Sequence, residues 1–343
     1  MNIYDLRSDT ITKPSEAMRK AMYKAQVGDD VYGEDPTVNK LQELSNKITG
    51  KKSSLFVSSG SMANLITLFI NGGRGKDVLM HNEAHSLHHE LGAPAAIAGV
   101  NPIGVPGERG ILRSEILQEY VNPKSGAYHD AKTSMIIIEN THNFAGGTCY
   151  YKENLKDVQS FAHKYGLSLH IDGARIFNAS IATGLSVKEI SSYADTITFC
   201  LAKGLGAPVG AILSGSKEFI DEAKIVRKML GGGLRQSGII AAGGLYALEH
   251  NIPRLIEDHI NAKTLAKCLN GKAWAKVDPN TIETNILFFD TVGIPASKLE
   301  RKLARRGILC FATGENTIRF VTSLSVTKQD INSICGIINS LEI

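Results

Sequence analysis

The stretch that most constrains this chain is residues 196–213, TITFCLAKGLGAPVGAIL. Residues 196–201 and 208–213 are apolar and partly β-branched, which predicts two buried strands. Between them one lysine, Lys203, lies among glycines and other small residues. Lysine is rarely buried without a partner, and a glycine-flanked lysine at a strand end suits a reactive amine against which a flat ligand packs. A solvated loop lysine is an equally open interpretation of this stretch taken alone.

A second stretch, LSLHIDGAR at residues 167–175, favours the reactive amine. It predicts another short buried strand, which ends at Asp172. In a parallel α/β sheet, ligands bind outside the carboxyl ends of the strands, where both Asp172 and Lys203 would lie. A lysine that forms a Schiff base and an aspartate that faces a pyridinium nitrogen are the protein groups that pyridoxal phosphate requires.

Two runs, LHIDGARIFNA and CLAKGLGAPVG, resemble those of the low-specificity L-threonine aldolases, pyridoxal-phosphate enzymes of the aspartate-aminotransferase fold (fold type I). The resemblance covers nearly the whole chain. Further runs match the same family in chain order: DLRSDT at 5–10, VGDDVYGEDPTVNKLQ at 27–42, ENTHN at 139–143 and GGGLRQSG at 231–238.

The resemblance implies an α/β fold with a doubly wound, mostly parallel sheet and a smaller carboxy-terminal α/β lobe. A length of 343 residues independently favours about two domains. We expect an amino-terminal arm at 1–14, a large cofactor-binding domain at 15–250 and a small domain at 251–343. In the small domain the sequence predicts helices at 296–306 and 327–342 and strands at 285–289, 308–311 and 317–321.

The resemblance also implies roles for residues to which the sequence alone assigns none. Ser8, Arg175 and Arg319 would bind the substrate carboxylate, with Arg175 also close to the cofactor, and Tyr32 would line the site. Arg235 would reach the cofactor phosphate of a neighbouring subunit. The three glycines before Arg235 and its planar guanidinium are chemically suited to that task.

A strand at 54–58 is followed by Gly60 and Ser61 and then by a helix that we expect to continue to about Ile70. Ser61 suits a helix N-cap, and the free amides beyond it would form an anion site favoured by the helix dipole. A phosphate there is one interpretation. An ordinary serine N-cap is the other.

Four histidines fall within nine residues: His81, His85, His88 and His89. No third ligand with a recognised metal spacing follows, so we expect no metal. By resemblance, His85 would stack on the cofactor ring and contact the substrate, although HSLHHELGA departs from the HxxxxEAGG of the family.

A separate histidine, His129, aligns with a second family histidine placed near the substrate hydroxyl. A solvated loop histidine remains the alternative for His129, because it lies in the polar run Tyr-His-Asp.

Composition narrows the class of protein. A net charge of +4 without a basic block argues against a nucleic-acid partner. The start lacks an apolar signal core, and the longest uncharged run, 91–107, is broken by three prolines, so we expect no membrane partner. Five scattered cysteines without a C-x-x-C pair favour a reducing cytoplasm and no structural zinc. The resemblance implies a homo-oligomer, dimer or tetramer, with sites at subunit interfaces.

The implied activity is that of a carbon–carbon lyase: retro-aldol cleavage of L-threonine, L-allo-threonine and other β-hydroxy-α-amino acids to glycine and an aldehyde such as acetaldehyde. Two alternatives stay open. One is another pyridoxal-phosphate lyase of the same fold that eliminates at Cβ. The other is a non-catalytic binding protein that kept the fold.

Overall fold

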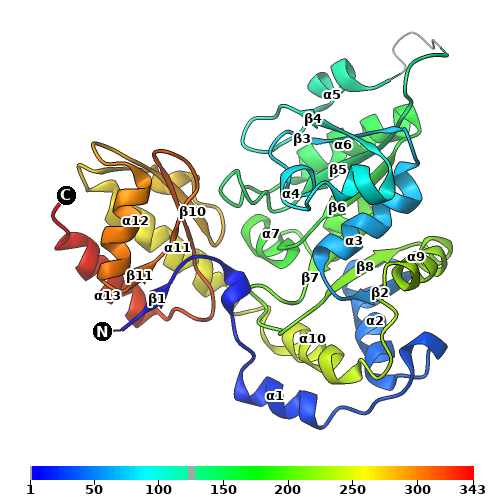
Figure 1. The fold of residues 1–343 in the computed structure, drawn as a ribbon, viewed down its shortest axis with the longest axis horizontal. Helices are drawn as coiled ribbons and strands as arrows, with labels where there is room; N and C mark the ends of the chain where they lie inside the picture. Colours follow the sequence, from blue (N-terminus) through cyan, green and yellow to red (C-terminus); the bar gives the residue numbers. More distant parts are fainter. Residues whose placement is uncertain (1, 123–127) are drawn as a thin grey trace.

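The computed structural model describes residues 2–122 and 128–343 and consists of two α/β lobes (Figure 1). The larger lobe contains a seven-stranded sheet, and the smaller lobe contains a four-stranded antiparallel sheet. The predicted fold class, a mostly parallel doubly wound sheet with a smaller carboxy-terminal lobe, is confirmed. No helix of the described residues is long and apolar enough to cross a membrane.

One strand of the large sheet runs against all the others. The order is β2 (Ser53–Val57), β8 (Ala211–Gly215), β7 (Thr196–Cys200), β6 (Ser168–Asp172), β5 (Thr133–Glu139), β3 (Asp77–His81) and β4 (Asn101–Val105). Every neighbouring pair is parallel except the two pairs that β8 makes with β2 and β7. A short loop can join only antiparallel neighbours. The direct return from β7 into β8 therefore fixes the loop that carries Lys203 at the carboxyl end of β7.

Helices cover both faces of this sheet, as its alternating buried side chains require. Leu79, Ile136 and Ile138 pack on the face covered by α2, α6 and α10, whereas Val78 and Ile137 face α3. The helices of this lobe are α1 (Glu16–Tyr23), α2 (Pro36–Thr49), α3 (Gly60–Thr67), α4 (His85–His88), α5 (Ser114–Tyr120), α6 (Lys152–Tyr165), α7 (Ile176–Thr183), α8 (Val187–Ser192), α9 (Lys217–Met229) and α10 (Gly238–His250).

The smaller lobe has its own apolar core. Its sheet has the order β12 (Phe311–Ala312), β13 (Thr317–Val321), β10 (Ile286–Thr291) and β9 (Ala275–Lys276). Its helices are α11 (Leu255–Asn270), α12 (Ala296–Arg305) and α13 (Lys328–Asn339). The chain start joins this lobe, because β1 (Tyr4–Asp5) pairs with β11 (Ile308–Leu309) and Leu6 lies in the same core. The division at residue 250 stays a prediction, which the two separate cores support.

Two boundaries and one strand differ from the sequence-based expectations. The strand expected from residue 208 begins at Ala211, and the helix expected to continue to about Ile70 is α-helical only to Thr67. Strand β4 was not predicted, since its uncharged run contains Pro102. It is one of the two edge strands of the sheet, where the missing proline amide disturbs the pairing least.

Candidate active site

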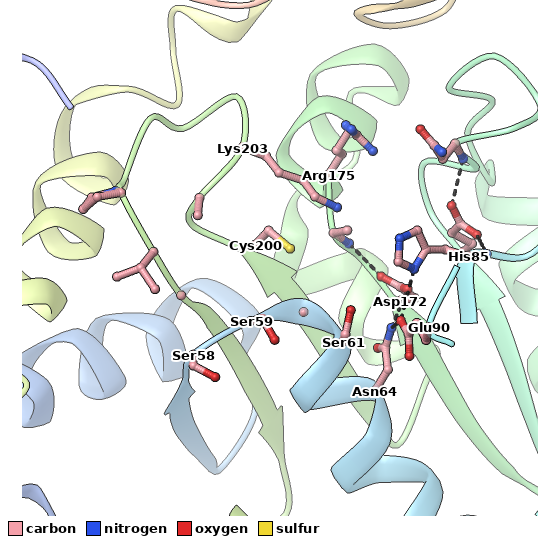
Figure 2. Close-up of a pocket in the computed structure, with 18 residues that line it drawn as sticks. Ser58, Ser59, Ser61, Asn64, His85, Glu90, Asp172, Arg175, Cys200 and Lys203 are labelled. Atoms are coloured by element: carbon pink, nitrogen blue, oxygen red, sulfur yellow. Dashed lines mark hydrogen bonds and ion pairs between the residues drawn. The ribbon is translucent and has the colours of Figure 1, made fainter. Parts of the chain in front are cut away.

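A cavity of about 330 Å³ opens at the carboxyl ends of β5, β6 and β7 (Figure 2). It lies where ligands bind in open α/β sheets. Six of the residues expected at the site line it: Gly60, Ser61, His85, Asp172, Arg175 and Lys203.

Lys203 is held by its backbone, so that its side chain reaches into the cavity (Figure 2). Its carbonyl oxygen accepts hydrogen bonds from Thr12 Oγ1 and from the Gly206 amide, both at 2.8 Å. The loop then returns through Gly210, whose φ of +105° is open only to glycine. A Cβ at Gly210 would also lie 2.4 Å from Phe56. The glycines of this stretch therefore serve a tight turn that places one amine.

Asp172 is buried at the end of β6 and presents a fixed carboxylate. Its Oδ2 accepts a hydrogen bond of 2.7 Å from Asn64 Nδ2, and its Oδ1 accepts one of 3.1 Å from the Ala174 amide. Asn64 comes from α3 and was missed in the sequence. The available signal was a polar side chain in the otherwise apolar run MANLI.

His85 is fixed by two carboxylates. Its Nδ1 lies 3.1 Å from Glu90 Oε1, and its backbone amide donates to Glu139 Oε2 at 2.9 Å. Burial disfavours the charged imidazole, but the hydrogen bond to Glu90 and the charge of Asp172 outweigh burial and raise the pKa of His85. With Nδ1 engaged, Nε2 is left for a ligand.

Both glutamates were missed as site residues. Glu90 Oε1 also accepts from Asn64 Nδ2 at 3.1 Å, and Glu139 Oε1 accepts from the Asn143 amide at 2.8 Å. Burial and the neighbouring charge of Asp172 raise the pKa of Glu139. The contact of Glu90 with Asn64 and that of Glu139 with the His85 amide join distant segments of the chain, and local sequence pattern carries no signal for such contacts.

The first turn of α3 forms one wall of the cavity. Ser59 is its N-cap, with Oγ accepting from the Met62 amide at 3.1 Å, so the expectation that Ser61 is the N-cap was wrong. The extended backbone of Ser59 (φ −158°, ψ 162°) is what an N-cap needs, whereas Ser61 already lies inside the helix. The amides of Gly60 and Ser61 belong to the first turn, which lacks intrahelical acceptors and favours anions.

Two arginines lie at or next to the lining of the cavity. Arg175 lines the cavity and forms a two-bonded ion pair with Asp9. Arg319 does not line the cavity itself. Its Nη1 lies 3.5 Å from Oδ1 of Asn143, and Asn143 is a lining residue. Burial and the charge of Arg175 lower the pKa of Arg319.

The other expected residues lie outside this cavity. Ser8 caps the short 3-10 turn Asp9–Ile11. Tyr32 is exposed, with the Arg235 guanidinium 5.9 Å from its ring centre, and Arg235 pairs with Asp29 at 2.9 Å. The side chain of His129 is 70% exposed. Within the described ranges no three metal-binding side chains come together.

Comparison with known proteins identifies the family of this chain. The model of the beta-eliminating lyase family matches residues 5–292. Low-specificity L-threonine aldolase 1 of Arabidopsis thaliana is 42% identical over 337 residues, 97% of this chain and 94% of that protein. The low specificity L-threonine aldolase of Escherichia coli K12 is 41% identical over 333 residues, 97% of each chain.

Solved structures share the fold. The threonine aldolase of Leishmania major superposes with a TM-score of 0.83 and 18% identity, covering 98% of each chain. A serine palmitoyltransferase of Sphingomonas wittichii does so with a TM-score of 0.76 and 14% identity, covering 98% of this chain and 86% of that one. The sequence matches show that the chain belongs to the beta-eliminating lyase family and, within it, to the low-specificity L-threonine aldolases.

Proposed function

We propose that this protein is a pyridoxal-phosphate-dependent aldolase that cleaves the Cα–Cβ bond of L-threonine, L-allo-threonine and other β-hydroxy-α-amino acids. The products would be glycine and an aldehyde such as acetaldehyde. One observation carries the proposal: Lys203, Asp172, His85 and Arg175 line a single cavity. The names of the relatives at 41–42% identity support the same reaction.

The donor set of this cavity fits pyridoxal phosphate. Lys203 supplies an amine for a Schiff base, and Asp172 supplies a fixed carboxylate for a pyridinium nitrogen. The amides of Gly60 and Ser61 offer a phosphate site, and the flat ring of His85 offers a stacking surface. When bound, pyridoxal phosphate supplies an electron sink for the electron pair of the breaking bond.

Arg175 and Arg319 would bind the substrate carboxylate. Arg175 is at the cavity wall, and Arg319 reaches the wall through Asn143. Ser8 would assist from the amino-terminal arm. A carboxylate held by these groups fixes the rotation about Cα, and therefore decides which bond at Cα is cleaved.

His85 would take the proton of the β-hydroxyl while the Cα–Cβ bond breaks. Its Nδ1 is bonded to Glu90, which leaves Nε2 as the acceptor. Only the neutral imidazole can accept this proton. His129 remains a proposal for the same hydroxyl, in the cavity of a neighbouring copy, because its side chain is exposed outside this one.

We further propose a cytoplasmic homo-oligomer, a dimer or a tetramer. Tyr32 and Arg235 lie together on the surface, outside the cavity of their own chain, which supports a role at the site of a second copy. All five cysteines are free, which supports a reducing compartment.

Product analysis of the holoenzyme with L-threonine tests the reaction. Aldol cleavage predicts equal amounts of acetaldehyde and glycine. The second candidate, β-elimination, is favoured by the family name and predicts 2-oxobutanoate and ammonia instead. A panel that includes L-allo-threonine and a bulkier β-hydroxy amino acid defines the substrate range, and mainly 2-oxobutanoate would overturn the aldolase proposal.

A further inference from the structure

Asp9 lies directly behind Arg175 and is completely buried. Arg175 Nε donates to Asp9 Oδ2 and Arg175 Nη2 donates to Asp9 Oδ1, both at 2.7 Å. The aspartate therefore takes one edge of the guanidinium group. Among the described residues Nη1 has no hydrogen-bond partner, so the opposite end of the group is available to a ligand in the cavity.

The charges around Asp9 explain why a carboxylate belongs there. Burial disfavours its ionisation, but the charge and hydrogen bonds of Arg175 outweigh burial and lower the pKa of Asp9. Lys203 adds a weaker attraction of the same sign. Arg175 and Arg319 repel each other, and Asp9 offsets that repulsion. Two arginines and one aspartate leave one net positive charge, which matches one substrate carboxylate.

Asp9 is itself anchored from several directions. Asn285, which precedes β10 of the smaller lobe, donates to Asp9 Oδ2 at 3.3 Å and to the carbonyl of Thr322 at 3.1 Å. Three residues after Asp9, Thr12 Oγ1 donates to the carbonyl of Lys203 at 2.8 Å. The amino-terminal arm thus connects Arg175 to the smaller lobe and to the lysine loop.

We propose that Asp9 is a positioning residue: it holds the Arg175 guanidinium group with its free end directed at the carboxylate of the bound amino acid. This inference rests on the proposed function, in which Arg175 binds that carboxylate. Asp9 touches neither substrate nor cofactor in this account and acts only through Arg175.

The test compares glycine with ethylamine, in which a methyl group replaces the carboxylate. Glycine and ethylamine are titrated separately into the holoenzyme, and their dissociation constants are read from the visible absorbance of the cofactor. The native protein should bind glycine more tightly than ethylamine. In Asp9→Asn this preference should fall by about tenfold or more, the equivalent of one charge-assisted hydrogen bond. The different basicity of the two amines is common to both proteins and cancels.

The direction of the change separates positioning from simple charge reduction. If Asp9 served only to reduce the positive charge of the cavity, its loss would strengthen the preference for glycine. An unchanged or strengthened preference therefore overturns the inference. A native protein without any preference for glycine would instead overturn the carboxylate site of the proposed function, and the inference with it.

Asp258→Asn is the matched control. Asp258 forms a similar two-bonded pair with Arg254, at 2.6 and 3.0 Å, but Arg254 does not line the cavity. This variant should unfold at a lower temperature, but the ratio of its dissociation constants for ethylamine and glycine should equal that of the native protein. If Asp9→Asn yields no folded protein, Asp9→Glu, which moves the carboxylate by one methylene, is measured in the same way. The preference of Asp9→Glu for glycine over ethylamine should fall at least threefold. A preference equal to that of the native protein would overturn the inference.

Discussion

Glu90 shows how a single side chain sets the chemistry of the cavity. One oxygen, Oε1, contacts both His85 Nδ1 and Asn64 Nδ2, and Asn64 in turn holds Asp172. The imidazole and the carboxylate that would serve the cofactor are therefore oriented by one small network. Because Glu90 is buried, its charge acts on His85 with little screening by solvent.

Glu90→Gln should shift the pH dependence of the reaction. The native glutamate helps to raise the pKa of His85. On acidification the neutral imidazole, which is the acceptor of the hydroxyl proton, is therefore lost at a higher pH than in an ordinary histidine. Removing the charge lowers that pKa, and the acidic limb of kcat/KM should move to lower pH. Glu83, which is exposed and close to His85 in the sequence, provides the control: in Glu83→Gln the acidic limb of kcat/KM should keep its native position. A native limb in Glu90→Gln would contradict the assignment of the limb to His85.

At the scale of elements, the start of α3 is packed against the end of β7. A Cβ added to Gly60 would lie 2.9 Å from Cys200 Sγ, a distance at which one of the two must move. This contact brings the first amides of the helix to the cavity wall. Gly60 therefore serves a close approach between two elements.

Gly60→Ala should lower the free energy of unfolding by about 1–3 kcal/mol through overpacking, and should weaken cofactor binding in parallel. Cys200→Ala removes the obstructing sulfur, so the double variant should recover most of both losses. Urea unfolding and cofactor titration of the two single variants and the double variant measure the coupling. Strictly additive losses would show that the Gly60–Cys200 contact is not the cause.

The elements that sequence predicted well are those with uninterrupted apolar runs. Strands β6 and β7 and the lysine loop were expected, because their apolar and partly β-branched runs are typical of buried strands. Strand β4 was missed because its proline is tolerated only at a sheet edge, which is a property of the assembled sheet. Glu90 and Glu139 were missed for a similar reason, since each also contacts a segment that lies far away in the sequence.

At the scale of the whole molecule, the described chain leaves part of the expected site outside its cavity. Lys203, Asp172, His85 and Arg175 line that cavity together. Tyr32, Arg235 and His129 lie on the surface. A single sequence names such residues only through the family resemblance, because their function would depend on a second copy.

Arg235→Ala should weaken cofactor affinity by about 1.5–3 kcal/mol, the scale of one charged hydrogen bond to phosphate. Titration of the apoenzyme with pyridoxal phosphate measures this loss. Lys224→Ala is the matched control, because it also removes an exposed cation paired with an aspartate, here Asp221. Equal affinity of Arg235→Ala and the native protein would place Arg235 outside every phosphate site of the assembly.

Lys203 is proposed to be the amine that carries the cofactor. Borohydride reduction of the holoenzyme, followed by peptide mapping, locates that amine directly. One pyridoxyl group per chain is expected, on Lys203, and Lys203→Ala should show neither the adduct nor turnover. A reduced adduct on a different lysine, with native turnover in Lys203→Ala, would contradict it.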